Sequence, residues 1–466
     1  MQTTYLKLKS TEIVADTYTP IGIYLRLRDA YPQCLLLECA DYSNRNNAFS
    51  YICLKPFAGI EVVKTGIKTY NSYEQLEEKH EVDDVVNFID SFFKSFKLEN
   101  PNSDNSTAGF FGFTAYDSIN LFDSVNIEIS NSTLPLIKYD LYQVVLEFNH
   151  FNNTLVLYEL ITPNASEIGE KVLSLLANRN TPVFPFKTIS KETSNMSDDT
   201  YIDMVEKCKS HCARGDVFQI VLSRQFSQQF SGDDFNVYRA LRSINPSPYL
   251  FYFDYLNFRI FGSSPEAHLK VIDGIASINP IAGTAFRSGN TLLDQKATED
   301  LLKNPKENSE HCMLVDLARN DLSRHTRNVV VDKFREVHTY SHVIHLVSNV
   351  KGELKENTSP LALLASTFPA GTLSGAPKHK AVQLIGKIEP TPRGIYGGAV
   401  GFIGLNGNVN HAIIIRSFLS LNGSLHYQAG AGVVIGSSPK GELQEVNSKV
   451  SALRRAIEYA EKTFLN

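Results

Sequence analysis

The chain has 466 residues, of which 43% are hydrophobic and 20% are charged, and its formal net charge is −5. This length allows two or more domain-sized units, and the composition is ordinary for a globular protein. The basic residues are scattered, so the sequence predicts no nucleic-acid partner. No apolar run approaches the roughly 18 residues of a membrane span, and the start of the sequence lacks a signal-peptide pattern. We therefore expect a cytoplasmic protein that does not enter a membrane.

Residues 1–177 are predicted to form one unit rich in short strands. An amphipathic pattern predicts one helix at about 83–96, and the polar stretch 100–107 is typical of a loop. Residues 178–198 have neither a helical nor a strand period, so we expect a linker there. Apolar runs predict strands at 34–39, 49–54, 144–148 and 155–158.

Residues 199–466 are predicted to form a second unit. It opens with an expected helix at 199–213, ended near Gly215, and a strand at 217–226. Further strands are predicted at 251–255, 267–271, 398–402, 412–419 and 426–434. Further helices are predicted at 294–303, 305–319, 360–367, 377–387 and 439–463. Because strands and helices interleave without a regular βαβ rhythm, we expect the α+β fold class.

Two Glu-x-x-Glu pairs, Glu307/Glu310 and Glu442/Glu445, each lie early in a predicted helix. Residues three apart share a helix face, so each pair presents two carboxylates in one direction. Four carboxylates brought together would repel one another unless a hard cation such as Mg²⁺ lay among them. Acidic residues also favour helix N-termini, so two solvated helix faces are the alternative.

Glycine-rich segments at 369–378, 394–407 and 430–441 are candidate ligand-binding loops. None of them completes a dinucleotide fingerprint or a Walker A sequence. Their backbone N–H groups are better suited to a small anionic ligand.

Three basic side chains are candidates for contact with such an anion. Arg416 lies in an apolar run, where a guanidinium is costly unless a side-chain or ligand carboxylate pairs with it. Lys449 follows Glu445 by four residues, so it either pairs with that glutamate or reaches a ligand. His345 lies among apolar residues, where a histidine is more often part of the core. Together these residue types indicate a magnesium-assisted enzyme that acts on a small polycarboxylate.

Six ordered motifs carry a family resemblance. They are SPE (264–266), NPIAGT (279–284), EHCMLVDLARNDLSR (310–324), FPAGTLSGAPK (368–378), RGIYGGAVGF (393–402) and GAGVVIGSSPKGELQEVNSK (430–449). They resemble the motifs of the chorismate-utilising enzymes, most closely those of the anthranilate synthase component I branch. GFFGFTAYD at 109–117 extends the resemblance into the first unit. It implies two layers of antiparallel β-sheet flanked by helices, with a regulatory part at 1–177 and a catalytic part at 199–466.

The resemblance also implies how chorismate is bound. Mg²⁺ would bridge Glu310 and Glu445 to the ring carboxylate, while Glu307 and Glu442 would hold metal-bound waters. Arg416 and Tyr396 would bind the enolpyruvyl carboxylate. The other substrate-binding positions that the resemblance implies are Gly283, Thr284, Gly430, Gly432 and Lys449.

Catalytic roles follow from the same resemblance. Glu266 would protonate the departing C4 hydroxyl, and His345 would serve the later loss of pyruvate, with Thr372 nearby. Relatives that make aminodeoxychorismate carry an attacking lysine where this chain has Ala282. Isochorismate synthases carry a water-activating lysine where it has Gln219.

Ala282 and Gln219 therefore favour ammonia as the nucleophile and anthranilate as the product, the first step of tryptophan biosynthesis. The alternatives are an unusual aminodeoxychorismate synthase and a non-catalytic module that binds tryptophan or chorismate. Intact acidic and basic motif residues disfavour the latter.

The sequence has no glutamine amidotransferase motif, so ammonia is expected from a separate subunit, component II, in a hetero-oligomer. The resemblance also implies feedback inhibition by tryptophan. The positions implied for tryptophan are Leu37, Glu38, Cys39, Pro248, Tyr249 and Leu250. Cys39 and Leu250 replace the usual Ser and Met, and a thiol is the weaker hydrogen-bonding group.

Overall fold

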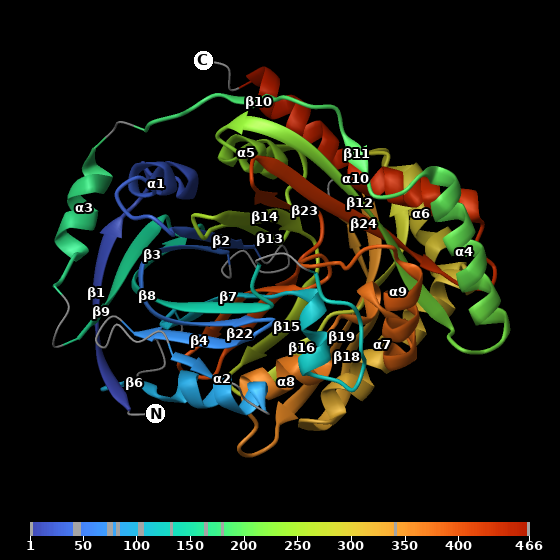
Figure 1. Cartoon of the computed structure of the whole chain (residues 1–466), viewed down its shortest axis with the longest axis horizontal. Coiled ribbons are helices and arrows are strands. Elements are labelled where there is room, and N and C mark those ends of the chain that lie inside the picture. The colour runs from blue at the N-terminus through green and yellow to red at the C-terminus, as the bar shows by residue number, and fades with distance from the viewer. Residues whose placement is uncertain are drawn as a thin grey trace.

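The structure is a computed structural model of the whole chain (Figure 1). It describes residues 3–40, 48–71, 78–80, 84–100, 107–130, 134–162, 166–178, 181–339 and 343–463. Most of the loop expected at 100–107 lies outside the described residues.

Two long antiparallel strands, β3 (Phe49–Val63) and β8 (Ile137–Asn149), organise the sheets. From this pair, neighbouring strands extend in two directions. The strands on the β3 side are, in order, β2 (Leu35–Cys39), β13 (Tyr249–Asp254), β14 (Phe258–Ser264), β23 (Ser417–Leu421), β24 (Ser424–Val433) and β12 (Gln219–Gly232). The strands on the β8 side are β7 (Gly109–Thr114), β21 (Ala399–Gly404), β22 (Val409–Ile413), β15 (Ala267–Ile272), β16 (Ile275–Ile278) and β19 (Val343–Leu354).

The remaining strands lie at the edges of these two runs. β19 also pairs with β17 (Ile281–Phe286) and β18 (Thr326–Thr339). The others are β1 (Thr4–Val14), β4 (Gly66–Asn71), β5 (Glu78–His80), β6 (Phe96–Leu98), β9 (Thr154–Ile161), β10 (Phe186–Thr188), β11 (Thr193–Ser194) and β20 (Gly375–Ala376). Within the described ranges every pairing is antiparallel except that of β1 with β6.

Side-chain packing shows that the two runs of strands form two layers. Leu37 and Phe251 of the first run pack in one apolar cluster with Phe111 and Val400 of the second. Two further clusters lie on the outer faces, under the helices. The helices are α1 (Pro20–Leu27), α2 (Val85–Lys94), α3 (Gly169–Ala177), α4 (Asp198–Ala213), α5 (Phe235–Ile244), α6 (Thr291–Lys303), α7 (Pro305–Ser323), α8 (Pro360–Thr367), α9 (Lys378–Ile388) and α10 (Pro439–Thr463). The expected α+β class with two antiparallel layers is confirmed.

Several expected elements have the expected bounds because their ends carry local signals. The helix expected at 439–463 is α10, and it begins at Pro439. Ser197 and Ser359 cap α4 and α8 by accepting hydrogen bonds from the N–H groups of Thr200 and Ala362.

Two expectations about secondary structure are wrong. Residues 178–198 are not without regular structure, because they contain β10 and β11, which pair with β12. These strands have only three and two residues, too few to show a period in the sequence. The strand expected at 412–419 is interrupted, since β22 ends at Ile413 and β23 begins at Ser417.

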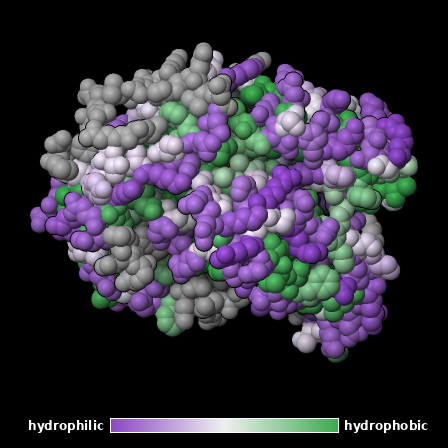
Figure 2. All heavy atoms as spheres, turned by 90° about the horizontal axis from the view of Figure 1, so that it is seen from below, coloured by the Kyte–Doolittle hydropathy of each residue, from purple (hydrophilic) through white to green (hydrophobic). Residues whose placement is uncertain are grey.

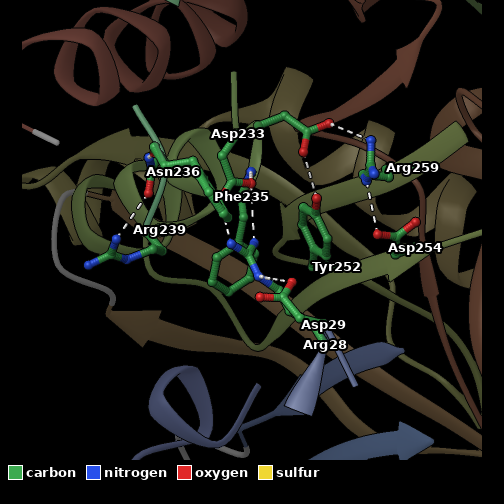
Figure 3. Close-up of polar contacts among 11 residues, drawn as sticks. Arg28, Asp29, Asp233, Phe235, Asn236, Arg239, Tyr252, Asp254 and Arg259 are labelled. Carbon is green, nitrogen blue, oxygen red and sulfur yellow. Dashed lines mark hydrogen bonds and ion pairs between the residues drawn. The ribbon is translucent and has the colours of Figure 1, made fainter. Parts of the chain in front are cut away.

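The two sequence units share one continuous pattern of strand pairing and several polar contacts. Strands β2 and β13 pair, as do β7 and β21, although each pair joins distant parts of the chain. Arg28, at the end of α1, donates two hydrogen bonds of 3.2 and 2.6 Å to Asp233, just before α5 (Figure 3). Beside this pair, the Tyr252 hydroxyl donates a 2.6 Å hydrogen bond to buried Asp234.

The surface is that of an ordinary globular protein, as the composition of the sequence indicates. Figure 2 shows one face on which hydrophilic side chains predominate and apolar atoms lie in separate patches. Across the described ranges, no helix combines the length and apolar character that crossing a membrane requires.

Candidate active site

The site lies where the chain passes twice between the two layers. Glu266 falls between β14 of one layer and β15 of the other. Arg416 falls between β22 and β23, which belong to the same two layers. The Ser263 N–H donates to the Arg416 carbonyl at 3.1 Å, and the Ile413 N–H donates to the Glu266 carbonyl at 3.0 Å. These backbone bonds hold the two crossings side by side.

The carboxyl group of Glu266 is the candidate general acid. Burial of its carboxyl raises the pKa to about 7, although three neighbouring groups oppose this rise. Thr372 donates a 3.0 Å hydrogen bond to Glu266 Oε1, and the charges of Lys449 and Arg416 also favour the ionised form. A carboxyl with a pKa near neutrality holds a proton that it can donate, which suits general acid catalysis.

A small pocket, with about 30 Å³ open to water-sized molecules, lies beside this carboxyl. One wall is formed by α7 with Leu314, Leu317 and Asp321, and another by residues 370–372. Glu266, just before β15, and His268 of β15 also line it.

Arg416 occupies a sharp turn instead of the expected strand. Its φ is 49°, and the Ile415 N–H donates to the Ile413 carbonyl at 2.9 Å, which ends β22. Burial lowers the pKa of Arg416, while Glu266 opposes that shift. The half-buried guanidinium forms no hydrogen bond and no ion pair with the described residues, and Glu266 acts on it only through its charge. An accessible arginine without a hydrogen-bonded carboxylate is suited to a carboxylate ligand.

Tyr396 and Lys449 lie against the glycine-rich strand β24. Lys449 Nζ donates to the Gly430 carbonyl at 2.8 Å and pairs with Glu445 at 2.7 Å. A side chain at Gly430 would meet the Leu222 carbonyl and the Tyr396 hydroxyl, so glycine permits this close approach. Burial raises the pKa of Tyr396, which therefore stays a neutral hydrogen-bonding group.

Gln219 faces β24 from the first residue of β12. Its side chain is buried, and Oε1 lacks a hydrogen-bond partner within the described part of the chain. A Cβ at Gly432 would collide with Gln219 Nε2, so the carboxamide lies directly against that backbone. Ala282 lies on β17, and its carbonyl is 3.0 Å from His311 Nδ1.

His345 lies on β19, opposite Thr284 of β17 and His338 of β18. Its Nδ1 is 3.3 Å from the Gly283 carbonyl. Burial lowers the pKa of His345, with Arg416 and His338 adding to the effect and the Gly283 carbonyl opposing it. Gly283 has a φ of +90°, which favours glycine at this bend. His345 thus belongs to the sheet of β17, β18 and β19. The sequence patterns had not predicted these three strands.

The four glutamates of the expected magnesium site lie at the starts of two helices. Glu307 is in the first turn of α7 and Glu442 is in the first turn of α10. Glu442 is buried, whereas Glu445 is exposed and paired with Lys449. Among residues with described positions, no three acidic, histidine or cysteine side chains come together as a metal site. The all-carboxylate donor set suits a hard cation, but the structure does not bring the four groups together.

The expected tryptophan-binding segments are brought together as neighbouring strands. Cys39 of β2 is opposite Tyr249 of β13, and Glu38 is opposite Leu250. The Ala40 N–H donates to the Pro248 carbonyl at 2.7 Å. Asn410 bridges the two strands. Its Nδ2 is 3.6 Å from Cys39 Sγ, and its Oδ1 accepts a 2.9 Å bond from the Tyr249 hydroxyl. Leu37 is buried in the core between the two layers.

The sequence motifs also contain pocket residues that had not been singled out. His268 follows Glu266 by two residues and reaches the same pocket. Asp321 of α7 pairs at 2.7 Å with Lys378 of α9. The only signal available in the sequence was that His268 follows Glu266 by two residues, because its direction depends on a β-bulge in β15.

Comparison with known proteins places the chain in a family. A model described as chorismate binding enzyme matches residues 38–455. The chain therefore belongs to the chorismate-binding enzymes.

Relatives from several bacteria extend over nearly the whole chain. Anthranilate synthase component 1 of Aquifex aeolicus is 35% identical over 97% of this chain and 95% of its own length. That of Lactococcus lactis is 36% identical over 96% of this chain and 98% of its own length. The solved structure of anthranilate synthase component I from Streptococcus pneumoniae has a TM-score of 0.76 and 29% identity, covering 95% of this chain and 99% of that one.

The fold is shared more widely than the sequence. The menaquinone-specific isochorismate synthase of Escherichia coli has a TM-score of 0.73 at 18% identity, covering 98% of this chain and 96% of that one. This second solved structure supports the two-layered fold alone.

Proposed function

We propose that this chain is the chorismate-converting component of an anthranilate synthase. Ammonia adds to C2 of chorismate as the C4 hydroxyl leaves, and loss of pyruvate then gives anthranilate. The observation that carries the proposal is the pair at the layer crossing, Glu266 with a pKa of about 7 and Arg416 without a carboxylate partner among the described residues. Relatives named anthranilate synthase component 1, at 35 and 36% identity, support the assignment.

Chorismate is a dicarboxylate, and the site offers it cations and neutral donors. Arg416 binds one carboxylate through its guanidinium fork, with the Tyr396 hydroxyl as a further donor. Lys449 adds positive charge beside the Gly430 backbone. The turn at Arg416 is fixed by backbone hydrogen bonds, so the base of this side chain is held at the layer crossing before the substrate arrives.

Glu266 protonates the departing C4 hydroxyl, which leaves as water. The pKa of about 7 lets the carboxyl keep its proton near neutral pH. Thr372 fixes one carboxyl oxygen through its 3.0 Å hydrogen bond, which leaves the other oxygen for the reacting group.

Gln219 and Ala282 select ammonia as the nucleophile. Gln219 Oε1 has no donor within the described residues, so it can accept a hydrogen bond from ammonia. A neutral carboxamide cannot deprotonate water, and the Ala282 methyl group cannot attack the ring. Burial lowers the pKa of His345, which keeps this imidazole neutral and able to accept the C2 proton when pyruvate is lost.

We infer that Mg²⁺ is the cofactor. Glu310 and Glu445 would hold it with Glu307 and Glu442, and when bound it would neutralise the ring carboxylate of chorismate. The support is the donor set of four carboxylates within the first two turns of α7 and α10. Chelation followed by titration with Mg²⁺ tests this, since a magnesium enzyme loses and then regains its activity.

We further infer a cytoplasmic enzyme that receives ammonia from a separate glutamine amidotransferase, component II. Residues 1–177 would form the regulatory part of the chain. Tryptophan would bind where β2 meets β13, since both expected segments lie there. Glu38 is already engaged by Arg242 and Tyr238, so the ligand would use neighbouring groups of the two strands. A rate unchanged at saturating tryptophan would contradict this regulation.

The direct test of the proposed function mixes the chain with chorismate, Mg²⁺ and an ammonium salt at mildly alkaline pH. We expect anthranilate fluorescence and an equal amount of pyruvate. A product that keeps its enolpyruvyl group would indicate an aminodeoxychorismate synthase instead. No conversion under these conditions would indicate a binding module and would overturn the proposal.

A further inference from the structure

A β-bulge directs His268 into the pocket beside Glu266. Ala267 of β15 is opposite Ala412 of β22, and Leu269 is opposite His411, so His268 is the extra residue between them. Bulges of this kind re-aim one side chain and are frequent next to active sites. The bulge therefore puts His268 and Glu266 on the wall of the same pocket.

His268 differs from the other polar side chains of this pocket. Asp321 is bound to Lys378, and the Thr367 hydroxyl donates to the Leu364 carbonyl. Thr372 donates to Glu266. Only 4% of His268 is exposed, yet neither ring nitrogen has a hydrogen-bond partner of normal geometry among the described residues.

Burial and the charge of Lys378 lower the pKa of His268 to about 3, while a contact with the Thr367 backbone, outside normal hydrogen-bond geometry, opposes the shift. The ring is therefore neutral, with one N–H donor and one nitrogen acceptor. Its contact with the Phe368 ring, at 5.8 Å between centroids and 81° between planes, uses the ring faces and edges. Packing alone does not account for the two nitrogens, because a buried polar group without a partner is costly.

The pocket offers about 30 Å³ to water-sized molecules and has several polar groups on its wall, so it has room for ordered water. A water between His268 and Glu266 would satisfy the imidazole and contact the carboxyl at once. The side chains of Asp321, Thr367 and Thr372 on the pocket wall each already bond a protein group.

We propose that His268 is a positioning residue that acts on Glu266 through a water molecule held in this pocket. The inference rests on the proposed function. The neutral imidazole donates to the water, and the water donates to the Glu266 carboxyl. This hydrogen bond fixes the orientation of the carboxyl, so that the oxygen carrying the proton points toward the C4 hydroxyl of chorismate.

The proton balance of the step closes without another reactant. The C4–O bond breaks as the hydroxyl takes the Glu266 proton and leaves as water. The ammonia that has formed the C2–N bond releases one proton, and Glu266 regains one proton from solvent. His268 begins and ends the step neutral.

The test uses the full chain with chorismate and Mg²⁺, at a constant concentration of free ammonia at every pH. His268→Leu removes both ring nitrogens at similar size, and His268→Gln restores one donor and one acceptor. The matched control is His411→Leu. His411 is also fully buried with a pKa of about 3, but it bonds the Tyr139 hydroxyl and does not line the pocket.

We expect His268→Leu to lower kcat about tenfold or more while KM for chorismate changes less than about twofold. The alkaline limb of the kcat profile should move to higher pH, because the lost donor no longer stabilises the Glu266 carboxylate. His268→Gln should restore most of kcat, and His411→Leu should keep kcat and the limb of the wild type.

Equal kcat and an unmoved limb in His268→Leu would overturn the inference while the proposed function stands. Equal losses in His268→Leu and His411→Leu, or in His268→Leu and His268→Gln, would also overturn it, since they indicate a purely structural role. If the wild type forms no anthranilate, the proposed function fails first and the inference fails with it.

Discussion

Two carboxyl groups, that of buried Glu38 and that of half-buried Glu266, have opposite surroundings. Glu38 accepts hydrogen bonds from Arg242 at 2.7 and 2.8 Å and from the Tyr238 hydroxyl at 2.6 Å. Glu266 accepts one side-chain hydrogen bond, from Thr372 at 3.0 Å, and burial raises its pKa to about 7. A carboxylate with a bidentate arginine anchors structure, whereas a desolvated and sparsely bonded carboxyl retains a proton for chemistry.

Arg393 and Arg416 show the same contrast between a fully bonded and a sparsely bonded charged group. Arg393 donates to Glu389 at 2.8 and 2.6 Å and to the carbonyls of Leu373 and Val221 at 2.6 and 2.7 Å. Arg416 makes no such bond within the described residues, and burial lowers its pKa. Glu38 and Arg393 are buried, whereas Glu266 and Arg416 are half-buried and sparsely bonded. Accessible charged groups with few protein partners at the layer crossing therefore indicate a place for a ligand.

The largest expected effect comes from Glu266→Gln. Because the amide cannot donate a proton of suitable acidity, kcat for anthranilate formation should fall by about a hundredfold to ten-thousandfold. KM for chorismate should change little, since the carboxyl size is kept. Initial rates of anthranilate fluorescence measure both. Activity within about tenfold of the wild type would assign the proton to another group.

Arg416→Lys should have the next largest effect. Lysine keeps the charge but loses the bidentate fork, so KM for chorismate should rise about tenfold to fiftyfold. Arg393→Lys is the matched control and should lower stability without a comparable change of KM. If both variants raised KM equally, the distinction between the two arginines would be lost.

Gln219→Leu should mainly change the use of ammonia. Removing the Oε1 acceptor should raise KM for ammonia about tenfold, while KM for chorismate stays near that of the wild type. Saturation curves for each substrate separate the two effects. Gly432→Ala provides a second route to the same result, because its Cβ would displace the carboxamide. A raised KM for chorismate alone would contradict this role.

The smallest expected effect on catalysis comes from Glu38→Gln. Loss of the charged acceptor for Arg242 and Tyr238 should lower the free energy of unfolding by about 2 kcal/mol. The value is moderated because the Arg242 side chain is 36% exposed and can reach water. Denaturant titration gives the stability change, and kcat should stay within about twofold. A large loss of kcat would contradict the structural role of Glu38.

Local signals in the sequence predicted much of the site. Proline at the start of α10 and the spacing of Glu442 and Glu445 were sufficient for the helix and the shared face. The resemblance supplied Glu266 and Thr372, and the structure puts them in contact. Such features depend on residues within one or two turns of each other, or on a family pattern.

Other features depend on contacts that sequence patterns do not encode. The turn at Arg416 exists because its carbonyl bonds Ser263, more than a hundred residues away, so an apolar run was read as one strand. The bulge at His268 requires the register of β22. The β17–β19 sheet that carries His345 was likewise missed, because β18 is largely exposed and both β18 and β19 mix polar and apolar residues.

The central claim is that Glu266 acts as a protonated acid, and the pH dependence of kcat tests it most directly. With free ammonia held constant, kcat should be level below the pKa of about 7 and fall as pH rises through it, because only the protonated carboxyl can donate. The same limb should be absent from the residual activity of Glu266→Gln. A wild-type profile that stays flat through this range, or an unchanged limb in the variant, would contradict the account.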